Sequence, residues 1–120
     1  MKYLFIAMGG AMGAVLRFSI SSLCYNVSNG GFPWGTLIVN VIGSFCLALF
    51  LGFSGEHSEL RFFLAIGLLG AFTTFSAFSY ETIFLFKSSA INLGILNIAA
   101  NFGLSLVAII SGYFLSQNIR

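Results

Sequence analysis

The sequence predicts an all-α membrane protein, with four transmembrane helices in one domain that covers residues 1–120. Hydrophobic residues make up 58% of the chain and charged residues only 7%. The mean hydropathy is +1.01, which is above what the surface of a soluble domain tolerates. Four apolar runs each reach the ~20 residues that a helix needs to cross a bilayer. They lie at about 3–23, 34–53, 61–86 and 91–115.

The connectors between these runs are short. Residues 24–33, 54–60 and 87–90 carry Asn, Ser, Gly and Pro, and they leave no room for a soluble domain or a long linker. The first run follows Lys2, as a secretory signal would, but no convincing small-x-small cleavage site precedes Arg17. We therefore expect the first helix to be retained.

The segment 70–78 predicts that the third helix is broken in mid-membrane. It reads Gly-Ala-Phe-Thr-Thr-Phe-Ser-Ala-Phe inside an otherwise apolar run. Lipid offers no partner to a free amide or carbonyl, so non-helical backbone at this depth requires protein or water around it. Phe75 and Phe78 would place two rings on one helical face, with positive ring edges that can meet an anion. Lipid-facing packing is the alternative for either ring.

Polar residues recur along single faces of two other helices. Asn40 lies near the middle of the second helix, where an unpartnered amide would cost about 1–3 kcal/mol. Asn97, Asn101 and Ser105 follow one another at four-residue spacing on the fourth helix. These side chains supply N–H and O–H donors without charge. Packing between helices and lining of a polar path both remain open as interpretations of these stripes.

Two charged residues lie within the predicted helices. Arg17 continues the four-residue spacing of Gly9 and Gly13, and it either reaches the lipid headgroups or has a structural or anion-attracting role. Glu81, near the end of the third helix, is either a solvated interfacial carboxylate or part of a pore entrance. A cation path would carry rings of Asp or Glu. Neutral donors beside phenyl edges therefore favour a small, strongly hydrated anion.

Lys and Arg residues are divided almost evenly between the two ends of the predicted bundle. Lys2, Arg61 and Arg120 fall on one side, and Lys87 falls on the other, with Arg17 toward the same end as Lys87. Orientation follows the Lys/Arg bias of short loops, and this bias is small. We expect the chain to insert in both orientations.

These motifs, taken in order, resemble those of the CrcB (Fluc) family of fluoride channels. The similarity rests on residues 9–17, 35–45 and 70–78 and on the helix that carries Asn97 and Asn101, so it covers all four helices. The order and spacing of the motifs and the length of 120 residues strengthen the resemblance. The run from Thr-Thr-Phe-Ser to a second Phe is its most distinctive part.

The resemblance implies a passive, fluoride-selective channel in the inner membrane that exports cytoplasmic fluoride down its gradient and gives fluoride resistance. It also implies an antiparallel, dual-topology homodimer with two pores between the subunits. The backbone carbonyls of Gly70 and Thr73 would hold a structural sodium ion on the two-fold axis, a role that unwound carbonyls of a broken helix suit. The fluoride pathway is expected to include Asn40, Thr74, Phe75, Ser76, Phe78, Asn101 and Ser105.

Two other functions remain open, and an enzyme is not expected. The sequence has no cluster of His, Cys and carboxylate residues with the spacing of a metal or catalytic site. A dual-topology, proton-coupled exporter of cationic drugs has a similar size, but it needs a carboxylate deep in the first helix, which this chain lacks. A non-transporting assembly protein would explain the glycines but not Asn40 beside the Thr, Ser and Phe residues of the break.

Overall fold

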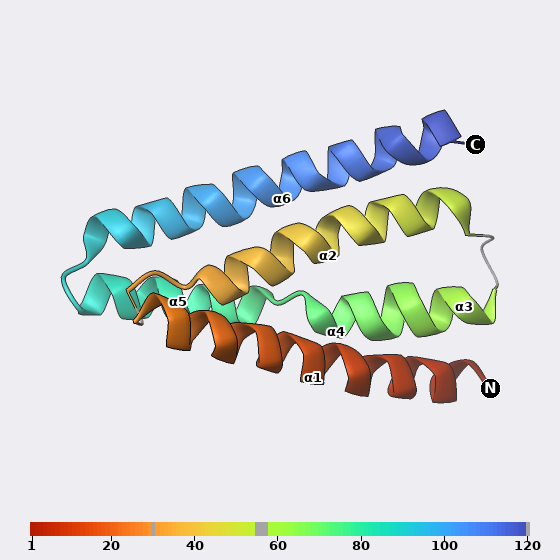
Figure 1. Ribbon diagram of the computed structural model, residues 1–120, viewed down its shortest axis with the longest axis horizontal. Helices are drawn as coiled ribbons and strands as arrows, with labels where there is room; N and C mark the ends of the chain where they lie inside the picture. The colour runs from red at the N-terminus through yellow and green to blue at the C-terminus, as the bar shows by residue number, and fades with distance from the viewer. Residues whose placement is uncertain (30, 55–57, 120) are drawn as a thin grey trace.

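The computed structural model describes residues 1–29, 31–54 and 58–119, and within these residues the regular structure is all helical. The molecule is elongated, with extents of 47 × 31 × 21 Å (Figure 1). Its long axis exceeds the ~30 Å hydrocarbon core of a bilayer. Four helical spans are long and apolar enough to cross a membrane: Lys2–Ser28, Trp34–Phe53, Glu59–Lys87 and Ile91–Ile119. The all-α, multi-pass membrane class predicted from the sequence is confirmed.

The first and last helices are longer than their apolar runs. Helix α1 (Lys2–Ser28) continues past residue 23, and α6 (Ile91–Ile119) continues past residue 115. An apolar run marks the part of a helix that lies in lipid, whereas backbone hydrogen bonds can continue through polar residues at the interface. Helix α1 ends where Asn29 takes a left-handed conformation, with φ of 52°. Between these two helices, α2 (Trp34–Phe53) begins directly after Pro33.

The third span consists of four elements: α3 (Glu59–Arg61), the π-helical η1 (Phe62–Leu69), α4 (Gly70–Phe72) and α5 (Phe75–Lys87). Between α4 and α5 the backbone is extended, with φ and ψ of −80° and 153° at Thr73 and of −151° and 124° at Thr74. The Thr74 side chain caps α5, since its Oγ1 accepts the Ala77 N–H at 3.1 Å. A new helix thus begins after only two extended residues.

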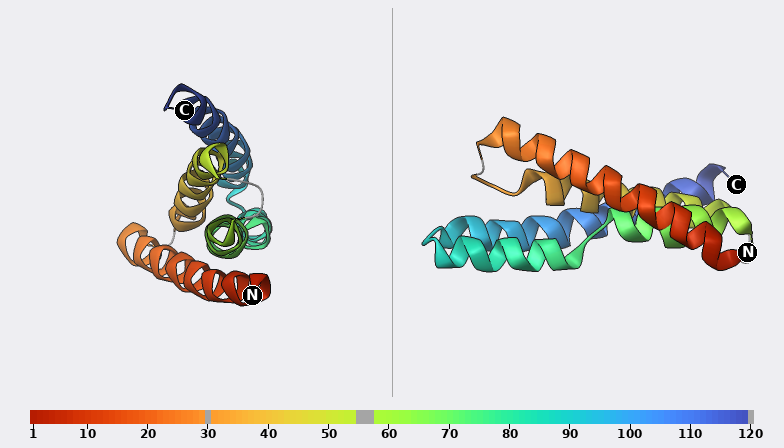
Figure 2. Two further views of the ribbon diagram at one scale, coloured as in Figure 1. Left: turned by 90° about the vertical axis from the view of Figure 1, so that its right-hand side faces the viewer. Right: turned by 90° about the horizontal axis from the view of Figure 1, so that it is seen from below.

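The helices pack as two groups that share the third span. Helix α1 lies against η1, α2 and α4, while α6 lies against α2 and α5, and Figure 2 shows α1 and α6 on opposite sides of the molecule. The contact of α1 depends on glycine. A Cβ added at Gly9 would lie 2.1 Å from the Phe63 carbonyl oxygen, and one added at Gly13 would lie 2.1 Å from the Leu68 carbonyl oxygen. Small residues of this kind allow close approach of membrane helices.

Both chain ends and α3 lie at the same end of the molecule (Figure 1). Lys2 and Arg61 therefore share this end, and Lys87 closes α5 at the other end. Arg17 lies in the half of α1 that ends at Ser28, and its Nε donates to the Ala71 carbonyl in α4, at 3.1 Å. Arg120 lies outside the described residues.

Candidate functional site

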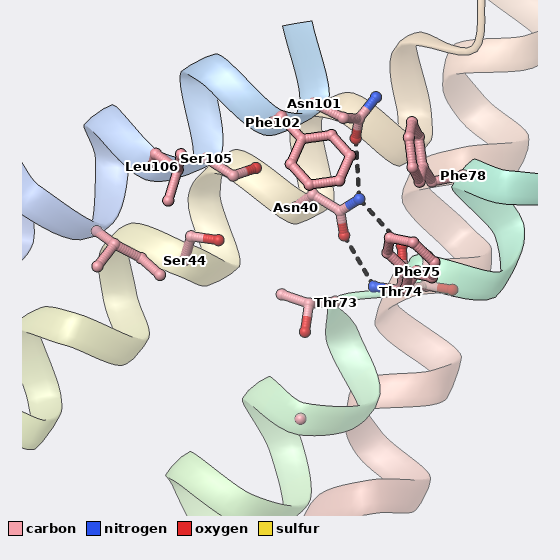
Figure 3. A pocket seen from close by; sticks show the side chains of 12 residues that line it. Asn40, Ser44, Thr73, Thr74, Phe75, Phe78, Asn101, Phe102, Ser105 and Leu106 are labelled. Atoms are coloured by element: carbon pink, nitrogen blue, oxygen red, sulfur yellow. Dashed lines mark hydrogen bonds between the residues drawn. The ribbon is translucent and has the colours of Figure 1, made fainter. Parts of the chain in front are cut away.

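A cavity of about 410 Å³ lies beside the extended Thr73–Thr74 segment, between α2, α6 and the third span (Figure 3). Its lining residues are all uncharged, and they include most of the residues that the sequence assigned to an ion site. They are Asn40, Ser44, Gly70, Thr73, Thr74, Phe75, Phe78, Asn101, Phe102, Ser105, Leu106 and Ile109. The fold therefore gathers the polar stripes of α2 and α6 at the place where the third span leaves the helical conformation.

Asn40 connects the extended segment to both α2 and α6. Its Nδ2 donates to the Asn101 Oδ1 at 2.9 Å and to the Thr74 carbonyl oxygen at 3.0 Å. Its Oδ1 accepts the Thr74 N–H at 2.8 Å, and Figure 3 shows all three bonds. One amide thus satisfies both backbone groups of Thr74, which a continuous helix would otherwise have paired within itself.

Two of the hydrogen bonds at the extended segment take N–H groups away from the carbonyls that they would pair with in a helix. In a continuous α-helix the Thr74 N–H would donate to the Gly70 carbonyl, and the Ala77 N–H would donate to the Thr73 carbonyl. Here the first donates to Asn40 Oδ1 and the second to Thr74 Oγ1. Gly70 and Thr73 both line the cavity. Their carbonyls have lost the usual donors, and carbonyl oxygens without such donors suit a hard cation.

Three phenyl rings form an edge-to-face cluster at the cavity. The centroids of Phe75 and Phe78 are 5.4 Å apart, and those of Phe78 and Phe102 are 5.8 Å apart, with interplanar angles of 60° and 78°. Phe78 is 6% exposed, whereas Phe75 is 70% exposed. Phe102 was not predicted from the sequence as a site residue. Its position three residues before Ser105 was a signal that it shares a helical face with that serine.

The hydroxyl groups at the site differ in their hydrogen bonding. Ser105 Oγ is buried in the cavity wall and has no hydrogen-bond partner within the part of the chain that the structure describes. Ser76 Oγ lies 3.2 Å from Thr74 Oγ1, but Ser76 is exposed and does not line the cavity. Ser44 does line it and was not assigned from the sequence, although it follows Asn40 by one helical turn. The Ser105 hydroxyl therefore has unused hydrogen-bonding capacity at the cavity wall.

The two charged candidates lie away from this lining. The Arg17 guanidinium contacts the Ala71 carbonyl near the end of α4, where helical carbonyls carry partial negative charge. Glu81 lines a second cavity of about 410 Å³, which shares no lining residue with the first. Its Oε1 accepts the Thr36 hydroxyl at 2.6 Å, and its Oε2 is buried. Glu81 is thus a partly buried, hydrogen-bonded carboxylate rather than a freely solvated one.

Comparison of the sequence with known proteins places this chain in a family. Residues 4–113 match the family described as CrcB-like protein, Camphor Resistance (CrcB). Proteins named Fluoride-specific ion channel FluC are similar over nearly their whole length. The one from Shewanella halifaxensis is 43% identical, covering 91% of this chain and 90% of the relative. The one from Thermus thermophilus is 42% identical, covering 93% and 92%. The one from Dehalococcoides mccartyi is 42% identical, covering 99% and 95%. The chain belongs to the CrcB family.

Proposed function

We propose that this protein is a fluoride channel that conducts the ion passively. The observation that carries the proposal is the convergence of neutral donors and phenyl rings on one cavity whose lining holds no charged residue. Rapid conduction requires sites that replace water around the ion and still release it, and a fixed Arg or Lys would hold a small anion more tightly. The names of the relatives support fluoride as the ion. An ion channel converts no substrate, so the family also agrees with the expectation that the chain is not an enzyme.

The ion contacts follow from what each group offers. Ser105 provides a hydroxyl with no other hydrogen-bond partner among the described residues. Both N–H groups of Asn40 and both of Asn101 already donate within the protein, so in this proposal each amide exchanges one of these bonds to donate to the passing ion. Phe75 and Phe78 provide ring edges of positive potential. In the cell, hydrogen fluoride enters as a neutral weak acid and dissociates in the cytoplasm. A passive pore in the inner membrane would let the trapped anion leave down its gradient, and the protein would thereby give fluoride resistance.

A second copy in the opposite orientation completes the pore in this proposal. Phe75 is 70% exposed and Phe102 is 53% exposed, so the cavity opens on the surface of the single chain. Facing lipid, its polar groups would lack partners, which hydrocarbon does not supply. An antiparallel homodimer would cover the opening and form two pores. The near balance of Lys and Arg between the two ends supports insertion in both orientations.

The opposed orientation can be tested by labelling. A cysteine placed after Arg120 and treated with an impermeant thiol reagent in intact cells should be modified in about half of the inserted molecules, since the charge bias is small. The same chain with Cys24 and Cys46 replaced and no added cysteine is the control for background. Modification of nearly all or of almost none of the functional protein contradicts dual topology.

A structural sodium ion on the two-fold axis would use the carbonyls of Gly70 and Thr73. In this proposal Thr73 and Thr74 interrupt the third span at mid-depth, and two subunits together offer four carbonyl oxygens from these positions. The diversion of the Thr74 and Ala77 N–H groups supports it. A sodium ion held in this way would not be transported. Radioactive sodium should therefore stay inside liposomes while fluoride leaves, and coupled loss of both ions would contradict the proposal.

The deciding experiment for the function is fluoride efflux from liposomes that contain the purified protein. Liposomes loaded with potassium fluoride should release the anion when valinomycin balances charge, without a proton gradient. Protein-free liposomes and liposomes loaded with potassium chloride are the controls. Equal release of chloride would contradict selectivity. Absence of fluoride release, together with proton-driven uptake of a cationic dye, would favour the exporter alternative, and neither activity would favour an assembly protein.

A further inference from the structure

A series of hydrogen bonds connects Thr82, in the middle of α5, to the cavity. The Thr82 hydroxyl donates to the Phe78 carbonyl at 2.8 Å, and Asn97 Nδ2 donates to Thr82 Oγ1 at 2.9 Å. Asn101 Nδ2 donates to Asn97 Oδ1 at 2.8 Å, and Asn40 Nδ2 donates to Asn101 Oδ1 at 2.9 Å. Thr82 and Asn97 do not line the cavity, and they are 5% and 0% exposed. Two fully enclosed residues are thus linked to two that line the proposed ion path.

The direction of this series is fixed by the backbone at both ends. The Phe78 carbonyl can only accept, so the Thr82 hydrogen points to it and the Thr82 oxygen accepts from Asn97. At the other end the Thr74 N–H can only donate, so the oxygen of Asn40 must face it. Reversal of Asn97, Asn101 or Asn40 alone would bring its N–H groups against the N–H of the next member of the network. The network therefore permits one orientation for each amide.

Asn101 has a further anchor of its own. Its Nδ2 also donates to the backbone carbonyl of Asn97, at 3.1 Å, which again can only accept. The oxygen of Asn101 is thereby directed to Asn40 Nδ2. The oxygens of these three asparagine side chains each accept an N–H. The Asn97 oxygen accepts from Asn101, the Asn101 oxygen from Asn40, and the Asn40 oxygen from Thr74. An anion in the cavity therefore meets no asparagine side-chain oxygen that lacks a donor.

We propose that Thr82 and Asn97 are positioning residues that set the polarity of the cavity for an anion. Without the Thr82 hydroxyl, Asn97 Nδ2 loses its acceptor, and the Asn97 oxygen is no longer held against Asn101 Nδ2. Asn101 then keeps only its bond to the Asn97 backbone carbonyl, and its oxygen can move away from Asn40. An amide oxygen would then face the cavity and repel fluoride. The inference rests on the proposed function for its ion, but the orientation of the Asn40 amide can be measured without any transport.

The first test compares three variants in the fluoride efflux assay. Thr82→Val keeps the shape of the side chain and removes the hydroxyl, so fluoride efflux should fall at least about tenfold, as for the loss of 1.4 kcal/mol. Thr82→Ser restores the hydroxyl and should recover most of the rate. Ser116→Ala removes another buried hydroxyl of the same bundle, one that donates to the Tyr113 carbonyl, and should leave efflux unchanged.

The second test follows the Asn40 side-chain amide by nuclear magnetic resonance in detergent micelles. Thr82→Val should displace the Asn40 Nδ2 signals although the two side chains do not touch, whereas Thr82→Ser and Ser116→Ala should not. Normal efflux per folded molecule of Thr82→Val, or unchanged Asn40 signals in it, overturns the proposal even if the variant is less heat-stable. If the unmodified protein moves no fluoride, the proposed function fails, and the Asn40 signals still decide whether Thr82 positions the amide.

Discussion

The α1 side and the α6 side of this molecule are held together by different interactions. On the α1 side, Gly9 and Gly13 let one helix backbone touch another, and carbonyl groups lie where a Cβ would stand. On the α6 side, Asn40, Asn97 and Asn101 join α2, α5 and α6 through side-chain hydrogen bonds. Lipid is as apolar as a leucine side chain, so the hydrophobic effect provides little attraction between helices. The α1 side relies on glycine contacts with backbone, whereas the α6 side adds side-chain hydrogen bonds to a contact of the same kind at Gly112, where a Cβ would lie 2.5 Å from the Phe45 carbonyl oxygen.

This difference suggests separate roles for the two sides, with packing on the α1 side and ion conduction on the α6 side. Backbone contact at Gly9 and Gly13 brings α1 directly against η1, and α1 also packs against α4. Arg17 links this side to the interruption through the Ala71 carbonyl. The hydrogen-bonded side keeps polar groups around a cavity of about 410 Å³. Changes on the α1 side should therefore affect folding, whereas changes on the α6 side should affect conduction.

The largest effect is expected from Gly9→Ala on the α1 side. Its Cβ would lie 2.1 Å from the Phe63 carbonyl oxygen and 2.9 Å from the Leu68 amide nitrogen, and neither backbone atom can move aside cheaply. Overpacking of this kind costs about 1–3 kcal/mol or more, so little monodisperse protein should be recovered and its thermal midpoint should fall. Gly10→Ala is the matched control, because its Cβ would meet only the Gly67 oxygen, at 4.0 Å. Equal stability of the two variants would contradict the contrast between the two sides.

A smaller but more selective effect is expected from Phe78→Ile on the α6 side. Isoleucine keeps most of the apolar bulk and lacks the positive ring edge, so fluoride efflux should fall about tenfold while assembly stays nearly normal. Phe75→Ile should act in the same direction. Phe114→Ile, at a ring that is 61% exposed, is the control and should change neither property. If both Phe75→Ile and Phe78→Ile conduct at the normal rate, the rings do not contact the ion.

Much of this arrangement could be predicted from the sequence because a bilayer constrains it so strongly. Apolar length gave the four spans, and helical spacing placed Asn40, Asn101 and Ser105 on inward faces. The sequence predicted an interruption within residues 70–78; in the structure Thr73 and Thr74 alone in this segment are extended, and the Thr74 hydroxyl caps the helix that follows. These features are local, so a single segment of sequence is enough to reveal them.

The features that the sequence did not reveal depend on pairs of distant segments. Phe102 shares a helical face with Ser105, but it joins the ring cluster only because α5 and α6 lie side by side, which neither segment shows by itself. The contact between Arg17 and the Ala71 carbonyl spans 54 positions. The π-helical bonding of η1 likewise has no marker in its uniformly apolar sequence. The ends of α1 and α6 were predicted too early for a different reason, because the length of an apolar run measures the lipid layer rather than the helix.

The smallest effect is expected from Ser105→Ala, which tests whether the unpartnered hydroxyl of the cavity wall contacts the ion. Ser105 Oγ has no hydrogen-bond partner among the described residues, so its removal breaks no bond of the fold. If it donates to fluoride, efflux should fall by about two- to tenfold, as for one hydrogen bond of ~0.5–1.5 kcal/mol, with normal thermal stability. Ser111→Ala, at an exposed position of α6, is the matched control. Unchanged efflux in Ser105→Ala would leave the amides and rings as the ion contacts, while a loss of stability without a loss of rate would move Ser105 from conduction to packing.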